Sequence, residues 1–498
     1  MERYDLLIVG GGINGAGIAR DAAGRGLKTL LVEQGDLGGA TSSASSKLIH
    51  GGLRYLERFQ FRLVAEALAE REVLLIAAPH LVRPLRFVMP HVPTLRPAWM
   101  IRAGLFAYDY LARRHALEAS HGVDLRSSPY GAGLKHEYGK GFVYSDCWVD
   151  DSRLVLVTAR AAADLGAAIL PRTACVAADR RGGSWCATLR GPGGIESQAE
   201  AAAIVNATGP WVGQFLDDVI RRPPGLGVKL VKGSHIVVPR LYEGNHAYIL
   251  QNEDGRVIFA YGYEGAYTLI GTTDVELRGA PADCDASAEE IDYLCRAANR
   301  YFERRVDPVD VVWSYCGVRA LFDDRSSNPS EVTRDYSLSI DGENGEPPLL
   351  SIVGGKITVF RRLAEQALST LAPWFPGMPG SWTQEAILPG GDLHGASFEA
   401  FVESRFRGDF PWLPPSLRYA LAGRHGELAY DVLGQSISLA DLGEHFGADL
   451  YAREIDYFVE REWVLSAEDV LWRRTKTGLH LDVGQRAAVA RYLERRLS

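Results

Sequence analysis

Residues 42–56, SSASSKLIHGGLRYL, bring many reactive side chains together within a short stretch. Hydroxyls and backbone amides can donate hydrogen bonds to a pyrophosphate or a flavin ring, and an imidazole can accept an alcohol proton at physiological pH. We expect Arg54 and Tyr55 to lie beyond such a cofactor, toward a substrate. A solvated polar loop with an ion-paired arginine explains the same residues. The choice between a binding loop and a solvated loop therefore depends on the neighbouring segments.

A glycine turn precedes this stretch. Gly10-x-Gly12-x-x-Gly15 follows a short apolar run and opens a helix of small residues, and Glu33 closes the next apolar run. Such glycines allow a tight turn that places a pyrophosphate on the helix N-terminus, while the carboxylate accepts a hydrogen bond from an unphosphorylated adenosine ribose. The full context predicts dinucleotide binding. FAD and NAD share this pattern, so it does not choose between them.

Two later turns favour a flavin. Asn206-Ala-Thr-Gly209 ends an apolar strand in small residues, which lets the backbone approach a cofactor closely. Gly354-Gly355-Lys356-x-Thr358 opens a helix whose amides and dipole favour the negative charge of a reduced flavin. An ordinary strand end and an ordinary helix N-cap explain each turn singly. A nicotinamide dehydrogenase would not need both.

A set of cations lies in otherwise apolar surroundings, and together they can hold a phosphate dianion: Arg54, Arg319, Arg334 and Lys356. Singly, each is more often part of a structural ion pair. His50 and His235 lie inside the motifs and are candidates to accept an alcohol proton. Structural histidines explain both equally well.

The pattern of elements predicts an α/β protein. Apolar runs at 4–9, 27–33, 201–209 and 349–353 read as buried strands, with helices at 15–24, 151–165 and 358–371. We predict a Rossmann-like dinucleotide-binding domain made of about 1–75, 145–225 and 345–372, with an inserted antiparallel-sheet substrate (cap) domain made of about 76–144 and 226–344. A Pro- and Gly-rich linker at 373–392 precedes a helical C-terminal domain at 393–498.

Composition excludes several classes of protein. The 498 residues are 47% hydrophobic and 23% charged, which is ordinary for a globular protein, and the net charge of −8 argues against a nucleic-acid partner. The six cysteines contain no CxxC pair, so we expect no metal site, no disulfide framework and a reducing compartment. The N-terminus lacks the pattern of a signal peptide, which predicts an intracellular protein.

One segment predicts contact with a membrane. Residues 95–114, LRPAWMIRAGLFAYDYLARR, combine aromatic and aliphatic side chains with four arginines and one acid. A short amphipathic helix of this kind can insert its apolar face among lipid headgroups while its cations meet anionic lipid. A core helix with paired arginines explains the same pattern.

Long motifs resemble the aerobic, flavin-dependent glycerol-3-phosphate dehydrogenases: GGGINGAG (10–17), TSSASSKLIHGGLRYL (41–56), YSDCWVDDSRLVL (144–156), NATGPWV (206–212), KGSHIVVP (232–239), AYILQNEDGR (247–256), IGTTDVE (270–276), GGKIT (354–358) and EWV…LWRRTKTG (462–478). The resemblance implies non-covalent FAD and oxidation of sn-glycerol 3-phosphate to dihydroxyacetone phosphate by hydride transfer to flavin N5. It further implies electron transfer to a membrane quinone and peripheral binding at the inner face of the cytoplasmic membrane. A homo-oligomer is compatible with the sequence.

The resemblance also implies roles for individual residues. Catalysis would involve His50, His235, Arg319 and Lys356, with the identity of the base left open between the two histidines. Substrate would meet Arg54, Tyr55, Thr272, Arg319, Arg334 and Lys356. FAD would meet Gly10, Gly12, Asn14, Gly15, Glu33, Thr41, Ser42, Ser43, Ser46, Lys47, Leu48, His50, Gly51, Gly52, Ala207, Thr208, Gly209, Trp211, Gly355, Lys356, Ile357 and Thr358.

Three departures from the family pattern bear on substrate preference. Ala320 replaces a usual proline, Phe259–Tyr263 replaces an apolar run with a Pro-Trp pair, and Val359-Phe360 replaces a usual Thr-Tyr. Three alternatives therefore stay open. They are a glycerol-3-phosphate oxidase that uses oxygen, an amine or 2-hydroxy-acid flavoenzyme, and a non-catalytic nucleotide-binding or membrane-scaffold protein.

Overall fold

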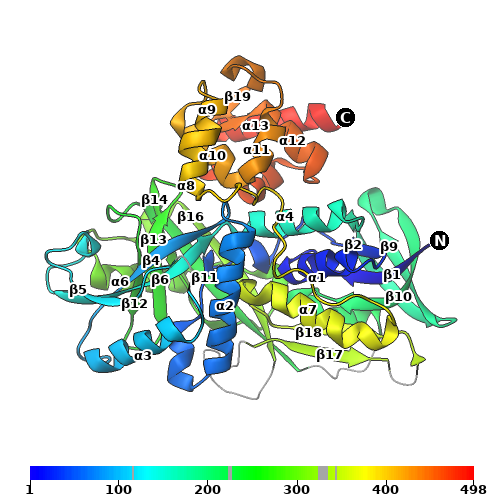
Figure 1. Ribbon diagram of the computed structural model, residues 1–498, viewed down its shortest axis with the longest axis horizontal. Coiled ribbons are helices and arrows are strands. Elements are labelled where there is room, and N and C mark those ends of the chain that lie inside the picture. The colour runs from blue at the N-terminus through cyan, green and yellow to red at the C-terminus, as the bar shows by residue number, and fades with distance from the viewer. Residues whose placement is uncertain (115–116, 222–226, 323–334, 343–344) are drawn as a thin grey trace.

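The computed structural model describes residues 1–114, 117–221, 227–322, 335–342 and 345–498. Figure 1 shows two sheet-containing halves side by side, with the C-terminal helices, in orange and red, lying above them. The N-terminus lies in the half on the right of that view, and the second sheet lies in the half on the left.

The first sheet has eight strands and forms the dinucleotide-binding half. Its parallel strands are β1 (Glu2–Val9), β2 (Thr29–Val32), β7 (Ala168–Leu170), β10 (Glu196–Asn206) and β18 (Leu349–Val353), with β17 (Ser337–Asp341), β8 (Ala174–Arg181) and β9 (Ser184–Arg190) added antiparallel. The central strands are buried because the helices α1 (Ile13–Gly24), α4 (Asp151–Asp164) and α7 (Phe360–Leu371) pack together over the sheet. This is the predicted Rossmann-like arrangement.

The second sheet has ten strands and forms the cap. They are β3 (Leu48–Ile49), β4 (Val82–Pro90), β5 (His121–Asp124), β6 (Lys140–Val149), β11 (Val228–Pro239), β12 (Ala247–Gln251), β13 (Val257–Tyr263), β14 (Tyr267–Gly271), β15 (Val275–Glu276) and β16 (Trp313–Phe322). The pairs are antiparallel except β4 with β12. Helix α6 (Ala288–Tyr301) covers one face, and α2 (Phe61–Ala77) and α3 (Ala98–Tyr110) cover the other.

Strand pairing moves two of the expected domain boundaries. β17 pairs with β18 and so belongs to the first sheet, although it precedes residue 344. β6 continues through Val149 in the second sheet, and it pairs there with the short β3. The apolar run of each strand does not reveal which sheet it joins, because this depends on partners distant in sequence.

The C-terminal domain has its own core and is mostly helical. Its helices are α8 (Phe398–Ala400), α9 (Arg407–Asp409), α10 (Pro415–His425), α11 (Ala429–Leu433), α12 (Ala452–Arg461) and α13 (Val483–Leu497), with a hairpin of β19 (His445–Gly447) and β20 (Leu450–Tyr451). The 373–392 segment before it is packed, since Arg20 of α1 lies over the Trp382 ring and donates to the Ala386 carbonyl.

Cys284 and Cys316 form a disulfide. This corrects the expectation that the cysteine spacing is unsuited to disulfides. The chain between β15 and α6 returns beside β16, and this brings together two cysteines that are 32 residues apart in sequence. In the parts of the chain that the structure describes, no helix is long and apolar enough to cross a membrane.

Candidate active site

A cavity of about 870 Å³ extends from the carboxyl ends of the first sheet's strands to the second sheet. Its wall includes Val9 at the end of β1, Glu33 after β2, Ala207 after β10 and Gly354 after β18. β2 and β10 lie on opposite sides of β1, so the strand order reverses here. Open α/β sheets bind their ligands at such a switch point.

The glycine turn lies in this wall with no room for side chains. Gly10 has φ +112°, and a Cβ there would lie 2.4 Å from the carbonyl oxygen of Ala207. A Cβ on Gly15 would lie 1.9 Å from the carbonyl oxygen of Gly10. Helix α1 begins directly after Gly12, so its positive end meets the cavity. Backbone amides at this end fit a pyrophosphate.

Glu33 supports the glycine turn as well as lining the cavity. One carboxylate oxygen accepts from the Gly11 amide and the other from the Gly35 amide, both at 2.7 Å. Burial raises the pKa of Glu33, and the two amides oppose that rise. Each oxygen has a second lone pair, so the carboxylate still fits a ribose hydroxyl.

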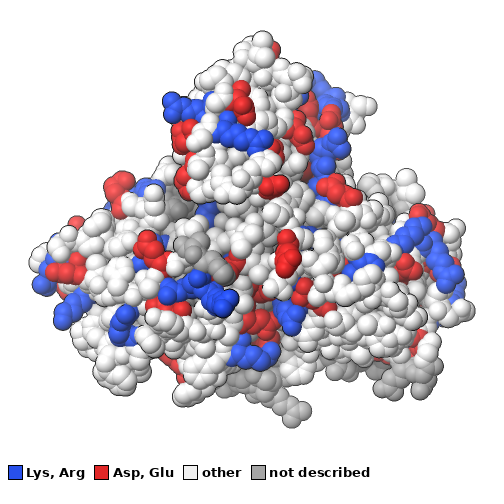
Figure 2. Space-filling view, viewed as in Figure 1, with Lys and Arg blue, Asp and Glu red and all other residues white. Residues whose placement is uncertain are grey.

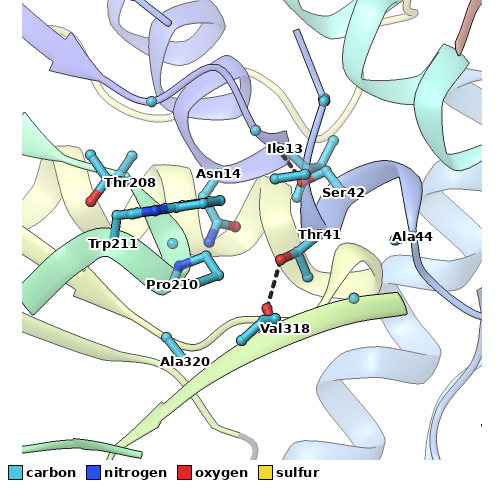
Figure 3. A pocket seen from close by; sticks show the side chains of 18 of the residues that line it. Ile13, Asn14, Thr41, Ser42, Ala44, Thr208, Pro210, Trp211, Val318 and Ala320 are labelled. Carbon is cyan, nitrogen blue, oxygen red and sulfur yellow. Dashed lines mark hydrogen bonds between the residues drawn. The ribbon is translucent and has the colours of Figure 1, made fainter. Parts of the chain in front are cut away.

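The serine-rich loop after β2 joins the glycine turn to the cap. Ser42 Oγ accepts from the Ile13 amide at 3.0 Å, and Thr41 Oγ1 donates to the Val318 carbonyl of β16 at 2.6 Å. Figure 3 shows Thr41 and Ser42 on one side of the cavity and Pro210 and Trp211 on the other. These hydrogen bonds fix the loop so that its small residues form the cavity wall.

Two residues predicted for the site lie behind this wall. Lys47 is buried, and its Nζ donates to Asp151 at 2.7 Å and to the Ser43 carbonyl at 2.9 Å. His235 is buried, with Nε2 2.8 Å from Ser46 Oγ and its ring stacked on Tyr315. Burial lowers the pKa of His235 well below its usual value, aided by the charges of Arg319 and Lys47. His235 therefore stays neutral and supports the wall.

Predicted substrate-site residues gather at the cap end of the cavity: His50, Tyr55, Thr272, Arg319 and Lys356. Arg319 donates to Asp274 at 2.7 Å, and Lys356 Nζ lies 3.8 Å from the centre of the Tyr55 ring. The His50 ring meets Phe259 edge to face. This end thus combines cations, an imidazole and apolar walls.

Most of the predicted cofactor residues also line the cavity: Gly10, Gly12, Asn14, Glu33, Thr41, Ser42, Ser46, Leu48, His50, Ala207, Thr208, Gly209, Trp211, Gly355, Lys356, Ile357 and Thr358. The other predicted cofactor residues lie in the adjoining backbone or behind the wall: Gly15, Ser43, Lys47, Gly51 and Gly52. Arg54, which was predicted for the substrate, is not among the residues that line the cavity. Arg334 lies outside the described residues.

Sequence reasoning missed several lining residues. Gly233 belongs to the KGSH motif, and a Cβ there would lie 2.6 Å from Thr272 Oγ1; a glycine inside a strand was the available signal. Asp274, which follows the two threonines of IGTTDVE, was also missed; it does not line the cavity but accepts the hydrogen bond of Arg319, which does. The C-terminal domain supplies a further group, which lies within the 462–478 motif although no role in the site was predicted for it: Ser466, Glu468, Asp469 and Arg473.

A Rossmann-like sheet whose switch point opens into a cavity under a cap defines a flavin-dependent oxidoreductase, and the chain belongs to that family. Residues 5–359 match the family model described as FAD dependent oxidoreductase. The enzyme's cofactor is FAD, as the two later turns predicted, and the non-catalytic alternative is set aside.

Within this family the chain is similar to the glycerol-3-phosphate dehydrogenases. It is 52% identical to glycerol-3-phosphate dehydrogenase of Pseudomonas aeruginosa, over 99% of this chain and 95% of that protein. It is 50% identical to D-erythritol 1-phosphate dehydrogenase of Brucella abortus, over 99% and 98%. The crystal structure of the glycerol-3-phosphate dehydrogenase from Bacillus halodurans complexed with FAD matches with a TM-score of 0.76 at 27% identity, over 99% and 94%. The resemblance found in the sequence motifs is confirmed.

Proposed function

We propose that this enzyme oxidises sn-glycerol 3-phosphate to dihydroxyacetone phosphate. The observation that carries the proposal is the pairing of a cationic end with an imidazole inside the FAD cavity. Arg319 and Lys356 provide positive charge for a phosphate ester, and His50 lies on the same wall. FAD, when bound, supplies the acceptor for the hydride equivalent.

Each residue at the cap end has a separate task. Arg319 offers a guanidinium fork to the phosphate, and Asp274 orients that fork through the 2.7 Å hydrogen bond. Lys356 precedes the first turn before α7, so its charge adds to the helix's positive end. His50 accepts the proton of the secondary alcohol, since it lines the cavity while His235 does not. Phe259 and Tyr55 exclude water from the reacting carbon.

The test is anaerobic reduction of the purified holoenzyme. Addition of sn-glycerol 3-phosphate should bleach the flavin absorbance. D-Erythritol 1-phosphate is the second candidate, because a relative 50% identical over nearly its whole length carries that name. If D-erythritol 1-phosphate bleaches the flavin with a higher rate constant than sn-glycerol 3-phosphate does, it would become the proposed substrate. Bleaching only by amino acids or 2-hydroxy acids would overturn both.

We also propose that the electrons pass to a membrane quinone and that α3 carries the enzyme onto the bilayer. Trp99, Phe106 and Tyr110 of α3 are 73%, 59% and 71% exposed. Phe59, which directly follows the short helical segment Leu53–Arg58 that contacts α3, is 80% exposed. Ile101, Leu105 and Tyr108 of the same helix face the core. Figure 2 shows little charge over α3, at lower left. A helix with one apolar face in the core and aromatic residues on the other fits an interfacial segment.

The arginines of this segment contribute less than the aromatic residues. Arg96 pairs with Glu57 and Arg114 pairs with Asp109. Arg102 donates to the carbonyl and the hydroxyl of Ser120, so three of the four arginines expected to meet lipid have partners within the protein. Arg102 and Arg113 are exposed. Binding should therefore depend on inserted aromatic groups first and on anionic lipid second.

Vesicle co-sedimentation tests this proposal. Trp99→Ser with Phe106→Ser should weaken binding to phosphatidylglycerol-containing vesicles at least ~10-fold, because each aromatic side chain contributes roughly 1.5–3 kcal/mol when buried. Ile195→Ser with Val309→Ser removes two apolar groups elsewhere that are at least as exposed, and is the control. Equal binding by the two double variants would exclude α3 as the membrane-binding segment.

The electron acceptor is tested separately by steady-state turnover. Rapid turnover with oxygen and none with quinone would indicate an oxidase.

A further inference from the structure

The C-terminal motif EWV…LWRRTKTG has no place in the reaction described above, yet part of it lies in the cofactor cavity. Ser466, Glu468, Asp469 and Arg473 line the wall, although they belong to a domain with a separate hydrophobic core. Ser466 and Glu468 come from the turn before the short helical segment Asp469–Arg474, and Asp469 and Arg473 come from the segment itself. The question is which part of FAD they face.

Their neighbours identify the adenosine end. Glu33 marks the ribose position in this fold. The Thr173 amide donates to the Glu33 carbonyl at 2.7 Å, and the Arg172 amide donates to the Gly35 carbonyl at 2.9 Å, so residues 172–175 lie beside Glu33. Arg172 Nη2 then donates to both oxygens of Asp469 at 2.7 Å. The C-terminal segment therefore adjoins the ribose site.

A buried ion network fastens the segment there. Arg473 donates to Asp36 of the first domain and to Asp469 of its own segment, and Arg474 donates to Asp36. Asp469 and Arg474 are fully buried. Burial would raise the pKa of Asp469, but the Leu465 amide and the neighbouring arginines lower it to about 2. Asp469 is therefore ionised at neutral pH and holds these arginines through charge-assisted hydrogen bonds.

We propose that Ser466–Arg473 is a clasp that closes the adenosine end of the FAD site, so that the C-terminal domain retains the cofactor. Arg473 and Asp469 are positioning residues that hold the clasp against Asp36 and Arg172. Because the clasp forms part of the site, FAD binding and docking of the C-terminal domain stabilise each other by equal free energies. This inference does not depend on which substrate the enzyme oxidises.

The experiment uses the full-length apoprotein and two fragments of the cofactor. ADP reports on the adenosine end and riboflavin on the flavin end. Arg473→Gln and Asp469→Asn should each weaken ADP binding about 10-fold and raise the rate of FAD release, with riboflavin affinity unchanged. Lys476→Met is the matched control, because Lys476 donates to Ser152 across the same domain seam but does not line the cavity.

Unchanged ADP affinity in both clasp variants would overturn the proposal, and so would an equal loss in Lys476→Met, which would indicate general loosening of the seam. A second measurement uses the wild-type protein alone. ADP should slow proteolytic cleavage within 373–392, the segment that leads into the C-terminal domain. Cleavage at the same rate with and without ADP would contradict the linkage.

Discussion

Individual side chains of the site serve both the fold and the chemistry. Asp274 holds one edge of the Arg319 guanidinium, and His235 supports Ser46 on the cavity wall. Sequence analysis singled out Arg319 and His235 alike as motif residues, but it could not separate a group that faces the cavity from one behind its wall. That distinction depends on which face of a strand meets which partner, and partners distant in sequence decide it.

Arg319→Ala should lower kcat/KM, and the corresponding loss of transition-state stabilisation should be on the order of 2–5 kcal/mol. The reason is that the substitution removes one member of a largely buried charge pair and leaves Asp274 uncompensated. The flavin content should stay at the wild-type level. Steady-state kinetics on flavin-loaded protein measures this. Arg256→Ala, which breaks an ion pair elsewhere on the cap, is the control. Wild-type kcat/KM in Arg319→Ala would remove the arginine from the substrate site.

His50→Gln should lower the rate of anaerobic flavin reduction by about 10²–10⁴, the usual contribution of a general base. His235→Gln should lower it far less, since Gln can still bond Ser46. Stopped-flow absorbance measures both. If His235→Gln is the slower variant, the assignment of the base is wrong.

Elements of the first sheet were the most predictable part of the molecule. β18 coincides with the predicted strand at 349–353, and β1, α1 and β2 follow in the expected order, because buried parallel strands leave uninterrupted apolar runs. The glycine turn between β1 and α1 was equally predictable from the sequence, because the spacing of its glycines depends on contacts within the β1–α1–β2 segment itself. The joining of β3 and β6 to the cap sheet was not readable, since each requires a partner from another part of the chain.

Gly10→Ala should yield protein without flavin. Its Cβ would meet the Ala207 carbonyl at 2.4 Å, and φ +112° is a conformation that alanine rarely adopts. The ratio of flavin to protein absorbance measures the loss. Gly26→Ala separates the two causes, because Gly26 has φ +82° but nothing within 4 Å of a Cβ. Equal flavin loss in both variants would assign the effect to backbone strain alone.

At the scale of the whole molecule, the contacts between domains were the least predictable. A separate helical C-terminal domain was expected and is present, but its contribution to the cavity wall was not expected. Arg172 and Asp469 are 297 residues apart in sequence, and no sequence pattern around either residue predicts that they form a pair. Long-range pairing of charged residues leaves no periodicity to read.

Stability should fall as the solution becomes acidic. His80 and His235 are buried, and burial lowers the pKa of each well below its usual value. A histidine whose pKa is lower in the folded state contributes its stability above the unfolded pKa of about 6.5, and that stability is lost as pH falls below it. At pH 5.5 the unfolded chain binds these protons while the buried imidazoles of the folded protein resist them, so the free energy of unfolding should be smaller than at neutral pH.

Chemical denaturation at pH 7.5 and 5.5 measures the loss. His80→Leu should reduce the difference between the two free energies of unfolding, whatever its effect at either pH. An unchanged difference would show that His80 does not contribute to the acid sensitivity.

The residues that line the cavity run in sequence from Val9 to Arg473, so the wall is complete only after nearly the whole chain has been synthesised. Ribosomes add about 5–20 residues per second, so roughly 20 to 90 seconds separate the synthesis of these two residues. During that time the nascent chain can pair most of its strands while one end of the flavin site stays open to water. If the C-terminal segment retains the cofactor as proposed, tight binding of FAD should therefore begin only when the chain is complete.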